Sequence, residues 1–215
     1  MVKQFGVQIR MSWAAVRALV AGGGVVGALW WLVRMVLSPN PFAGLSRPTT
    51  KKERASREQI GPAIRLYKVI SKNRNPDEAL QIVGAVILAA SQEFLRATIG
   101  EVDVAAYRAM DEPGRRVYLD TMADGFPNAR GEFRGLSESS FDYHISSCRF
   151  VELCAHAGVP ELMPAVCASD AAYFSDGPVA LTRPKLLSKN DTECHFQFST
   201  RERAKRESSV PLAKS

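Results

Sequence analysis

The residue types that could carry chemistry gather toward the C-terminal end of this 215-residue chain. All cysteines and all histidines lie between His144 and His195. The four cysteines are Cys148, Cys154, Cys167 and Cys194. Ionised thiols act as nucleophiles, and imidazoles exchange protons near neutral pH. A site for small-molecule chemistry is therefore expected in this window.

Cys148 is the first candidate within the window. It follows Ser146 and Ser147, which offer an N-cap, so Cys148 is expected in the first turn of a helix. Unpaired backbone N–H groups at that end, together with the neighbouring Arg149, favour the thiolate. The alternative is a buried, unreactive cysteine of the kind common in protein cores. Position alone leaves both interpretations open.

A thiol and a carboxylate stand three residues apart at a predicted helix end, namely Cys167 and Asp170. Asp170 could act as a general base on water or bind an ammonium or amidine group. The alternative is a capping aspartate. Cys194 alternates with two phenylalanines, which directs it toward the core or a pocket wall, whereas His195 points the other way and is expected at the surface.

The spacing of the cysteines argues against disulfides and against a zinc site. Structural zinc sites use close pairs of ligands, and the chain has no CxxC or HxxxH pair. No GxSxG, Walker or HExxH motif is present either. We therefore predict reduced thiols in a cytoplasmic compartment, and we expect no metal and no cofactor.

An apolar segment near the N-terminus is a candidate membrane anchor. Residues 18–33 are apolar without interruption, and Arg17 and Arg34 flank them with side chains long enough to reach the lipid headgroups. Tryptophans lie near both ends, as they do at membrane interfaces. A signal-peptide core and a buried helix are the alternatives. We predict a single membrane-spanning helix within residues 1–38.

The charges on either side of this segment predict its orientation. More Lys and Arg follow the span than precede it, which places the folded part in the cytoplasm. Gly23 and Gly27 form a GxxxG spacing that can pack two membrane helices together, so a homodimer is one assembly that the sequence permits.

The net charge of +6 comes largely from the two ends of the chain. Basic residues beside an apolar segment are typical of a membrane surface, so no nucleic-acid partner is expected. Prolines and polar residues predict a linker over residues 39–56. Residues 201–215 are charged and without periodicity, and we predict a disordered basic tail there.

Residues 57–200 predict an α+β domain, with a helical first half followed by a small antiparallel sheet with inserted helices. Asn75, Pro76 and Glu78 signal a helix start with a capping box. Helices are expected over residues 57–72, 76–100, 102–110, 115–123, 147–158 and 160–166, and strands around 141–145, 179–187 and 193–199.

An ordered run of residues in the second half resembles the L-2-amino-thiazoline-4-carboxylic acid hydrolase family. The run comprises Phe141, His144, Cys148-Arg-Phe150, Gly158-Val-Pro-Glu-Leu162, Cys167-Ala-Ser-Asp170, Leu181-Thr-Arg183 and Cys194-His-Phe196-Gln-Phe198. It covers roughly residues 132–199. The chain departs from the family pattern at three positions. Position 150 is Phe where the aromatic residue of the family is often Tyr. Asn190 stands where Gly is usual, and His195 stands where an acidic residue is usual.

The resemblance implies hydrolysis of a cyclic amidine. Water adds to the ring carbon between nitrogen and sulfur, and the ring opens to an N-carbamoyl cysteine. It implies Cys148 as nucleophile or acid and Asp170 as base or amidine anchor. The remaining implied site residues are Cys167, in a catalytic role, and His144, Phe150 and Cys194, which would bind the small-molecule substrate. The alternative is a non-catalytic small-molecule-binding or sensory module of related fold.

Overall fold

The computed structural model describes residues 2–100 and 102–201, with side chains from Gly6 onward. Apart from Arg201, the predicted basic tail lies outside these residues. The elements are α1 (Val2–Val36), α2 (Lys51–Ile70), α3 (Pro76–Thr98), α4 (Val104–Ala109), α5 (Glu112–Asp124), β1 (Ala129–Arg134), β2 (Ser140–Cys148), α6 (Arg149–His156), the 3₁₀ turn η1 (Pro160–Leu162), α7 (Met163–Tyr173), β3 (Val179–Lys185), the 3₁₀ turn η2 (Leu187–Lys189) and β4 (Cys194–Thr200).

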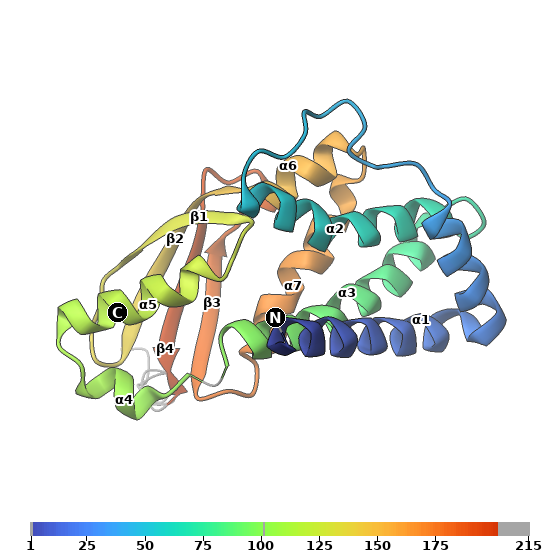
Figure 1. Cartoon of the computed structure of the whole chain (residues 1–215). Coiled ribbons are helices and arrows are strands. Elements are labelled where there is room, and N and C mark those ends of the chain that lie inside the picture. Colours follow the sequence, from blue (N-terminus) through green and yellow to red (C-terminus); the bar gives the residue numbers. More distant parts are fainter. Residues whose placement is uncertain (1, 101, 202–215) are drawn as a thin grey trace, which may run out of the picture.

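The architecture is α+β, as the sequence predicts, with a helical first half and a four-stranded antiparallel sheet. The strand order is β1-β2-β4-β3, and α6 and α7 are inserted between the second and third strands along the chain. Figure 1 shows the sheet at one end of the molecule beside α4 and α5, and α1, α2 and α3 at the other end. Helix α7 lies between these two parts, and α6 lies above α2 in this view.

Two of the helix starts follow from their caps. The Asn75 side chain accepts the Asp77 N–H at 2.8 Å, and Pro76 occupies the first turn of α3 as predicted. Glu78 does not complete the expected capping box through Asn75 but accepts from Arg74 Nη1 at 2.6 Å. The start of α2 differs from the prediction. Thr50 caps it, so residues 51–56, expected to be linker, are helical.

Helix α1 is kinked and packs along α3. Gly24 has φ of +68°, a conformation that side-chain-bearing residues rarely adopt, and it divides the helix into two parts. Leu19, Ala28 and Trp31 of this helix are buried. The Trp31 ring covers Gly23, where a Cβ atom would lie 2.0 Å from it. Gly23, whose spacing from Gly27 would permit the pairing of two chains, thus makes room for a tryptophan of its own chain.

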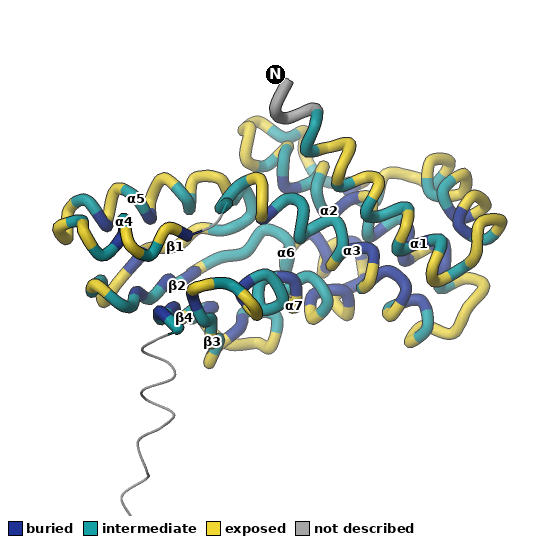
Figure 2. Tube along the Cα trace, turned by 90° about the horizontal axis from the view of Figure 1, so that it is seen from below, coloured by how far each residue is buried: buried dark blue, intermediate teal, exposed yellow. Residues whose placement is uncertain are grey.

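Two hydrophobic cores flank the middle of the molecule. The helical core is made by α1, α2, α3, α6 and α7, and includes Ile64, Ile70, Val83 and Leu153. The sheet core lies between the inner face of the sheet and helices α4 and α5. Its aromatic rings stack across strands, as for Phe141 and Phe198, which are register partners with ring centroids 4.7 Å apart. Figure 2 shows the buried positions along both parts.

Strand β1 was not predicted from the sequence. Only Phe133 of its six residues is buried, so the alternation that reveals a strand is weak. The pairing of β1 with β2 shifts register between Arg130 and Gly131, which leaves Ser146 as an extra residue on β2. Gly131 is required there, because a Cβ atom would lie 2.3 Å from the His144 carbonyl oxygen.

Candidate functional site

Cys148 lies where β2 ends and α6 begins. It occupies the N-cap position of α6 and is half-buried, and its Sγ accepts from Asn128 Nδ2 at 3.7 Å. The expectation of a serine cap before it is wrong, because Ser146 and Ser147 belong to β2, where Ser147 pairs with Arg130. Cys148 therefore lies one position before the first turn of the helix.

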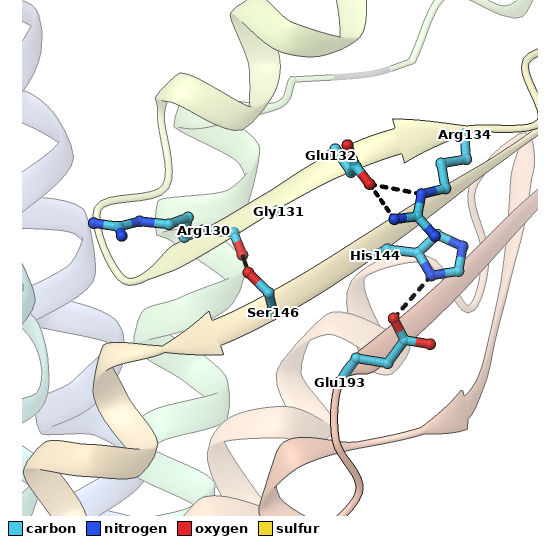
Figure 3. Close-up of a pocket in the computed structure, with 7 residues that line it drawn as sticks. All are labelled: Arg130, Gly131, Glu132, Arg134, His144, Ser146 and Glu193. Carbon is cyan, nitrogen blue, oxygen red and sulfur yellow. Dashed lines mark hydrogen bonds and ion pairs between the residues drawn. The ribbon is translucent and has the colours of Figure 1, made fainter.

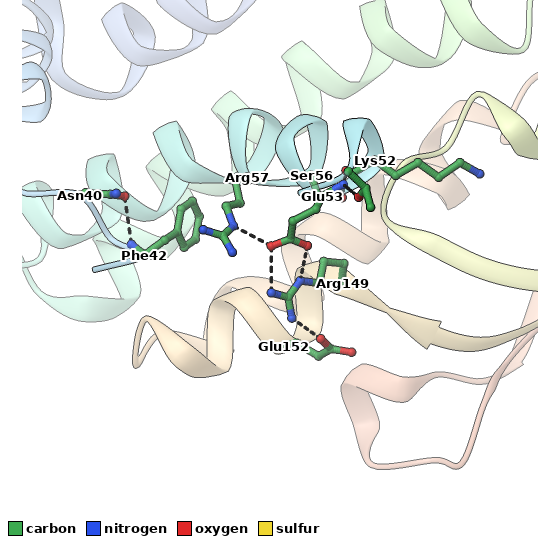
Figure 4. Close-up of polar contacts among 9 residues, drawn as sticks. Asn40, Phe42, Lys52, Glu53, Ser56, Arg57, Arg149 and Glu152 are labelled. Carbon is green, nitrogen blue, oxygen red and sulfur yellow. Dashed lines mark hydrogen bonds and ion pairs between the residues drawn. The ribbon is translucent and has the colours of Figure 1, made fainter. Parts of the chain in front are cut away.

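The positive charge of Arg149 is balanced by the carboxylates of Glu53 and Glu152. Its guanidinium donates to both carboxylate oxygens of Glu53, at 2.7 and 2.9 Å, and also contacts Glu152 (Figure 4). Arg57 Nε donates to Glu53 at 2.6 Å as well. The hydrogen bond from Arg149, more than any other interaction, lowers the pKa of Glu53. This network holds the start of α6 against α2 and so positions the residue before it, Cys148.

Replacing the shared carboxylate should loosen this junction. We expect Glu53→Gln to lower the free energy of unfolding by about 1–2 kcal/mol, because a partly buried bidentate ion pair is lost. Asp124→Asn is the matched control, since its ion pair with Lys52 is exposed, and it should cost less than about 0.5 kcal/mol. Urea denaturation of both variants measures this. Equal effects of the two changes would contradict a positioning role for Glu53.

Asp170 and Cys167 both lie on α7, three residues apart. Burial raises the pKa of Asp170 to about 6, and the positive charge of Arg183 opposes that rise. Arg183 Nη1 also donates to the backbone oxygen of Cys167, so β3 is tied to α7 at this point. A carboxyl group that titrates near neutral pH is suited to accepting and returning a proton.

The two remaining thiols of the site are held protonated. Burial raises the pKa of Cys194 to about 11, although the Leu187 N–H donates to its sulfur at 3.2 Å. Burial likewise raises the pKa of Cys167, whose Sγ lies 3.4 Å from Ser188 Oγ. Both groups are therefore neutral thiols at pH 7, which can donate protons or line a pocket.

Cys148, Cys167, Asp170 and Cys194 form what we call the thiol–carboxylate cluster. The charges of Cys167, Cys148 and Asp170 each influence the pKa of Cys194, and those of Asp170 and Cys148 influence the pKa of Cys167, so the four groups interact electrostatically. The cluster brings together β2, α7 and β4 at the junction of the two cores, since Cys167 packs on the helical core and Cys194 belongs to the sheet core. Four of the six predicted site residues thus belong to this cluster.

Phe150 packs on the helical core. It is partly buried against the helical core, in the first turn of α6. Cys154 on the same helix is fully buried, and burial raises its pKa to about 12. Cys154 is therefore a residue of the helical core.

His144 does not face the cluster. Along β2 the buried residues Tyr143 and Ile145 form the inner face, and His144 lies on the outer one, opposite His195 of β4. Cys194 pairs with Ile145 and shares the inner face. His195, expected at the surface, is half-buried and stacks on His144 with ring centroids 4.2 Å apart.

A cavity of about 240 Å³ borders His144 on this outer face (Figure 3). It is lined by Arg130, Gly131, Glu132, Arg134, His144, Ser146 and Glu193. His144 Nδ1 lies 3.1 Å from Glu193 Oε2, and Figure 3 shows this contact at the rim between β2 and the residue before β4. The predicted substrate contact of His144 would therefore belong to this cavity and not to the thiols.

Sequence reasoning did not assign a role to Arg183 or Asn128. Arg183 donates a hydrogen bond to the backbone oxygen of Cys167, and its positive charge opposes the rise in the pKa of Asp170. Asn128 contacts the sulfur of Cys148. Arg183 could have been found, because it is the one basic residue in the Leu181-Thr-Arg183 segment of the run described above. Asn128 carries no such signal, since only the pairing of β1 with β2 brings it to Cys148.

Comparison with known protein families gives one match. Residues 54–198 match the model described as L-2-amino-thiazoline-4-carboxylic acid hydrolase. The matched region runs from the first turn of α2 to β4 and contains the whole thiol–carboxylate cluster, whereas α1 lies outside it. A search of the curated proteins found no match.

Proposed function

Because the chain belongs to the L-2-amino-thiazoline-4-carboxylic acid hydrolase family, we propose that it hydrolyses a cyclic amidine of the 2-aminothiazoline type. One water molecule is consumed, the bond between the ring carbon and sulfur breaks, and the product is an N-carbamoyl cysteine with a free thiol. The observation that carries the proposal is the electrostatic interaction of Cys167 and Cys194 with Cys148 and with Asp170, a carboxyl group whose pKa is raised to about 6.

The proposed proton transfers centre on Asp170. In its ionised form it accepts a proton from the attacking water while the carbon–oxygen bond forms. In its protonated form it returns a proton to the departing sulfur, so no net proton is gained or lost by the enzyme. A pKa near 6 leaves both forms accessible at neutral pH, which supports this assignment. Arg183, beside it, would hold the carboxylate of the substrate.

We assign Cys148 the role of nucleophile. Its sulfur attacks the ring carbon as a thiolate, and the ring sulfur leaves as a thiol with the proton of protonated Asp170. Water then gives a proton to ionised Asp170 and displaces the Cys148 thiolate from the covalent adduct. Cys148 is half-buried and its sulfur is contacted by Asn128 Nδ2, whereas Cys154 is fully buried. The route consumes one water and requires no oxidant or reductant.

A non-catalytic binding module is the alternative function, and one assay separates the two. The purified full-length protein is mixed with 2-aminothiazoline-4-carboxylate, thiol release is followed by a colorimetric reagent, and binding is followed by calorimetry. Continuous thiol release over many turnovers is expected. Saturable binding without thiol release would overturn the hydrolase proposal in favour of the module.

The exposed apolar side of α1 supports a second proposal, that this helix anchors the protein in a membrane with the folded part in the cytoplasm. Among the described residues, Gly6–Val36 and Pro76–Thr98 are long and apolar enough to cross a membrane. The exposed apolar residues of α1 include Trp13, Val25, Val26, Leu29, Trp30, Val33 and Val36. Arg34 lies over the Trp30 ring at 5.3 Å, a pairing suited to the interface between lipid and water.

A negative charge introduced on the exposed apolar side of α1 should release the protein from the membrane. Val26 is 83% exposed, so Val26→Glu leaves the core intact but costs about 2–3 kcal/mol in a lipid environment. We expect the membrane-associated share of the protein to fall at least about tenfold in cell fractionation. Val117→Glu on α5, at a position 66% exposed, is the matched control and should leave the distribution unchanged. Equal partitioning of both variants would contradict the anchor.

A further inference from the structure

The outer face of the sheet carries a group of side chains that the proposed hydrolysis does not use. Asp142 and His144 are two residues apart on β2, and His195 on β4 is the register partner of His144. Each offers one ligand atom, and these atoms all lie within 4.8 Å of one another. This group lies on the opposite face of the sheet from Cys194, which with its partner Ile145 belongs to the inner face.

His195 contains a polar atom that lacks a suitable partner. Its Nε2 is buried and makes no hydrogen bond to any of the described residues. The nearest charged atom is Asp142 Oδ2 at 3.4 Å. A buried ring nitrogen without a hydrogen bond is costly, so a native structure normally provides a partner for it. A bound cation shared with Asp142 would be such a partner.

The distance between two of these ligand atoms fits a tetrahedral metal ion. Zinc–nitrogen and zinc–oxygen distances of about 2.0–2.2 Å place neighbouring ligand atoms roughly 3.3–3.5 Å apart. The 3.4 Å between His195 Nε2 and Asp142 Oδ2 falls in this range. Two imidazoles and a carboxylate are also the donor types that zinc and related divalent ions select over magnesium or calcium.

Glu193 lies next to this group, in contact with His144. Its Oε2 lies 3.1 Å from His144 Nδ1, and its Oε1 lies 3.4 Å from Lys185 Nζ. A carboxylate in contact with one ring nitrogen orients a histidine that binds metal through the other, and it can also serve as a further ligand. The cavity of about 240 Å³ beside His144 and Glu193 offers a path by which an ion or a water ligand reaches the group (Figure 3).

We propose that Asp142, His144 and His195 bind a divalent transition-metal ion of the zinc type, with Glu193 as an orienting partner or fourth ligand. The ion would link β2 to β4 across the outer face and leave a coordination position directed to the cavity. This inference is independent of the proposed hydrolysis, because it uses the opposite face of the sheet.

The test is a titration of the metal-free, full-length protein with zinc by calorimetry, followed by a visible absorption spectrum of the cobalt-loaded protein. One ion per chain is expected, with a cobalt spectrum that shows tetrahedral nitrogen and oxygen ligands and no thiolate-to-metal band. Asp142→Asn and His195→Gln should each weaken zinc binding at least about tenfold, since each removes one ligand. Circular dichroism checks that each variant is folded.

His156→Gln is the matched control, because His156 is the one histidine of the chain outside the group and is exposed. Its zinc affinity should equal that of the unchanged protein. Zinc affinity that is unaltered in both Asp142→Asn and His195→Gln would overturn the proposal. So would a thiolate-to-cobalt band, which would move the ion to the cysteines.

Discussion

The Asp170→Asn protein is expected to lose turnover of 2-aminothiazoline-4-carboxylate by roughly 10²–10⁴-fold. The reason is that an amide of the same shape can neither accept a proton from water nor return one to the departing sulfur. Initial rates of thiol release measure the effect. Asp176→Asn is the control, because Asp176 is an exposed carboxylate shortly after α7, and it should retain full activity. Comparable losses in both variants would contradict the assignment of Asp170.

The raised pKa of Asp170 also predicts a change in the pH dependence of stability for this variant, which can be measured without substrate. A carboxyl whose folded pKa of about 6 exceeds its ordinary value of 3.8 stabilises the fold when protonated, and that contribution is lost as pH rises through 6. We therefore expect Asp170→Asn to be more stable than the unchanged protein above pH 6, by about 1–2 kcal/mol, and to lose this advantage toward pH 4. Thermal unfolding at several pH values measures the difference. A pH-independent difference would show that Asp170 titrates normally.

The second large effect is expected for Cys148→Ser, which should reduce turnover at least about 10²-fold. A serine hydroxyl is far less ionised than a thiol near neutral pH, so the attack on the ring carbon and the covalent adduct are both lost. Rapid-quench mass spectrometry of the unchanged protein should reveal the adduct on the peptide containing Cys148, and the variant should show none.

Cys154→Ala is the matched control for this change. Cys154 is a fully buried thiol on α6 and is not one of the proposed catalytic residues, so its loss should cost stability by about 1–2 kcal/mol and leave turnover near that of the unchanged protein. A Cys148→Ser protein that retains full turnover would exclude Cys148 as the nucleophile.

The parts of the fold that follow from local signals were predictable from the sequence. Asn75 and Pro76 predict the start of α3, and the alternation of apolar residues around Phe141 and Phe198 predicts β2 and β4. In the site, the same alternation correctly separates Cys194 from His195. Each of these signals depends on neighbours within a few residues along the chain.

The parts that were not predictable depend on contacts between distant segments. His144 was expected to line the site with Cys148 because of the family resemblance, but it lies on the outer face of the sheet. The register shift opposite Arg130 and Gly131, which leaves Ser146 as an extra residue between His144 and Cys148, depends on strand pairing and has no local signal in the sequence. The ion pair of Arg149 and Glu53 joins residues far apart in sequence, so no local sequence pattern predicts that the charge of Arg149 is balanced.

The structure of the N-terminal segment was also only partly predictable from the sequence. Its composition predicts a membrane helix, and α1 retains an exposed apolar side that permits one. The kink at Gly24 and the burial of Trp31 over Gly23 depend on packing within the folded chain, which the local composition of the segment does not reveal. The predicted homodimer stays a prediction, and the contact that Gly23 was expected to make is occupied by Trp31.

The most direct test of the hydrolase proposal follows one oxygen atom. The purified full-length protein is incubated with 2-aminothiazoline-4-carboxylate in water labelled with heavy oxygen, and the products are analysed by mass spectrometry. The proposed chemistry predicts N-carbamoyl cysteine that carries one heavy oxygen in its carbamoyl carbonyl group. Recovery of the intact ring after prolonged incubation, or a product without the label, would contradict the proposal that this chain hydrolyses the ring.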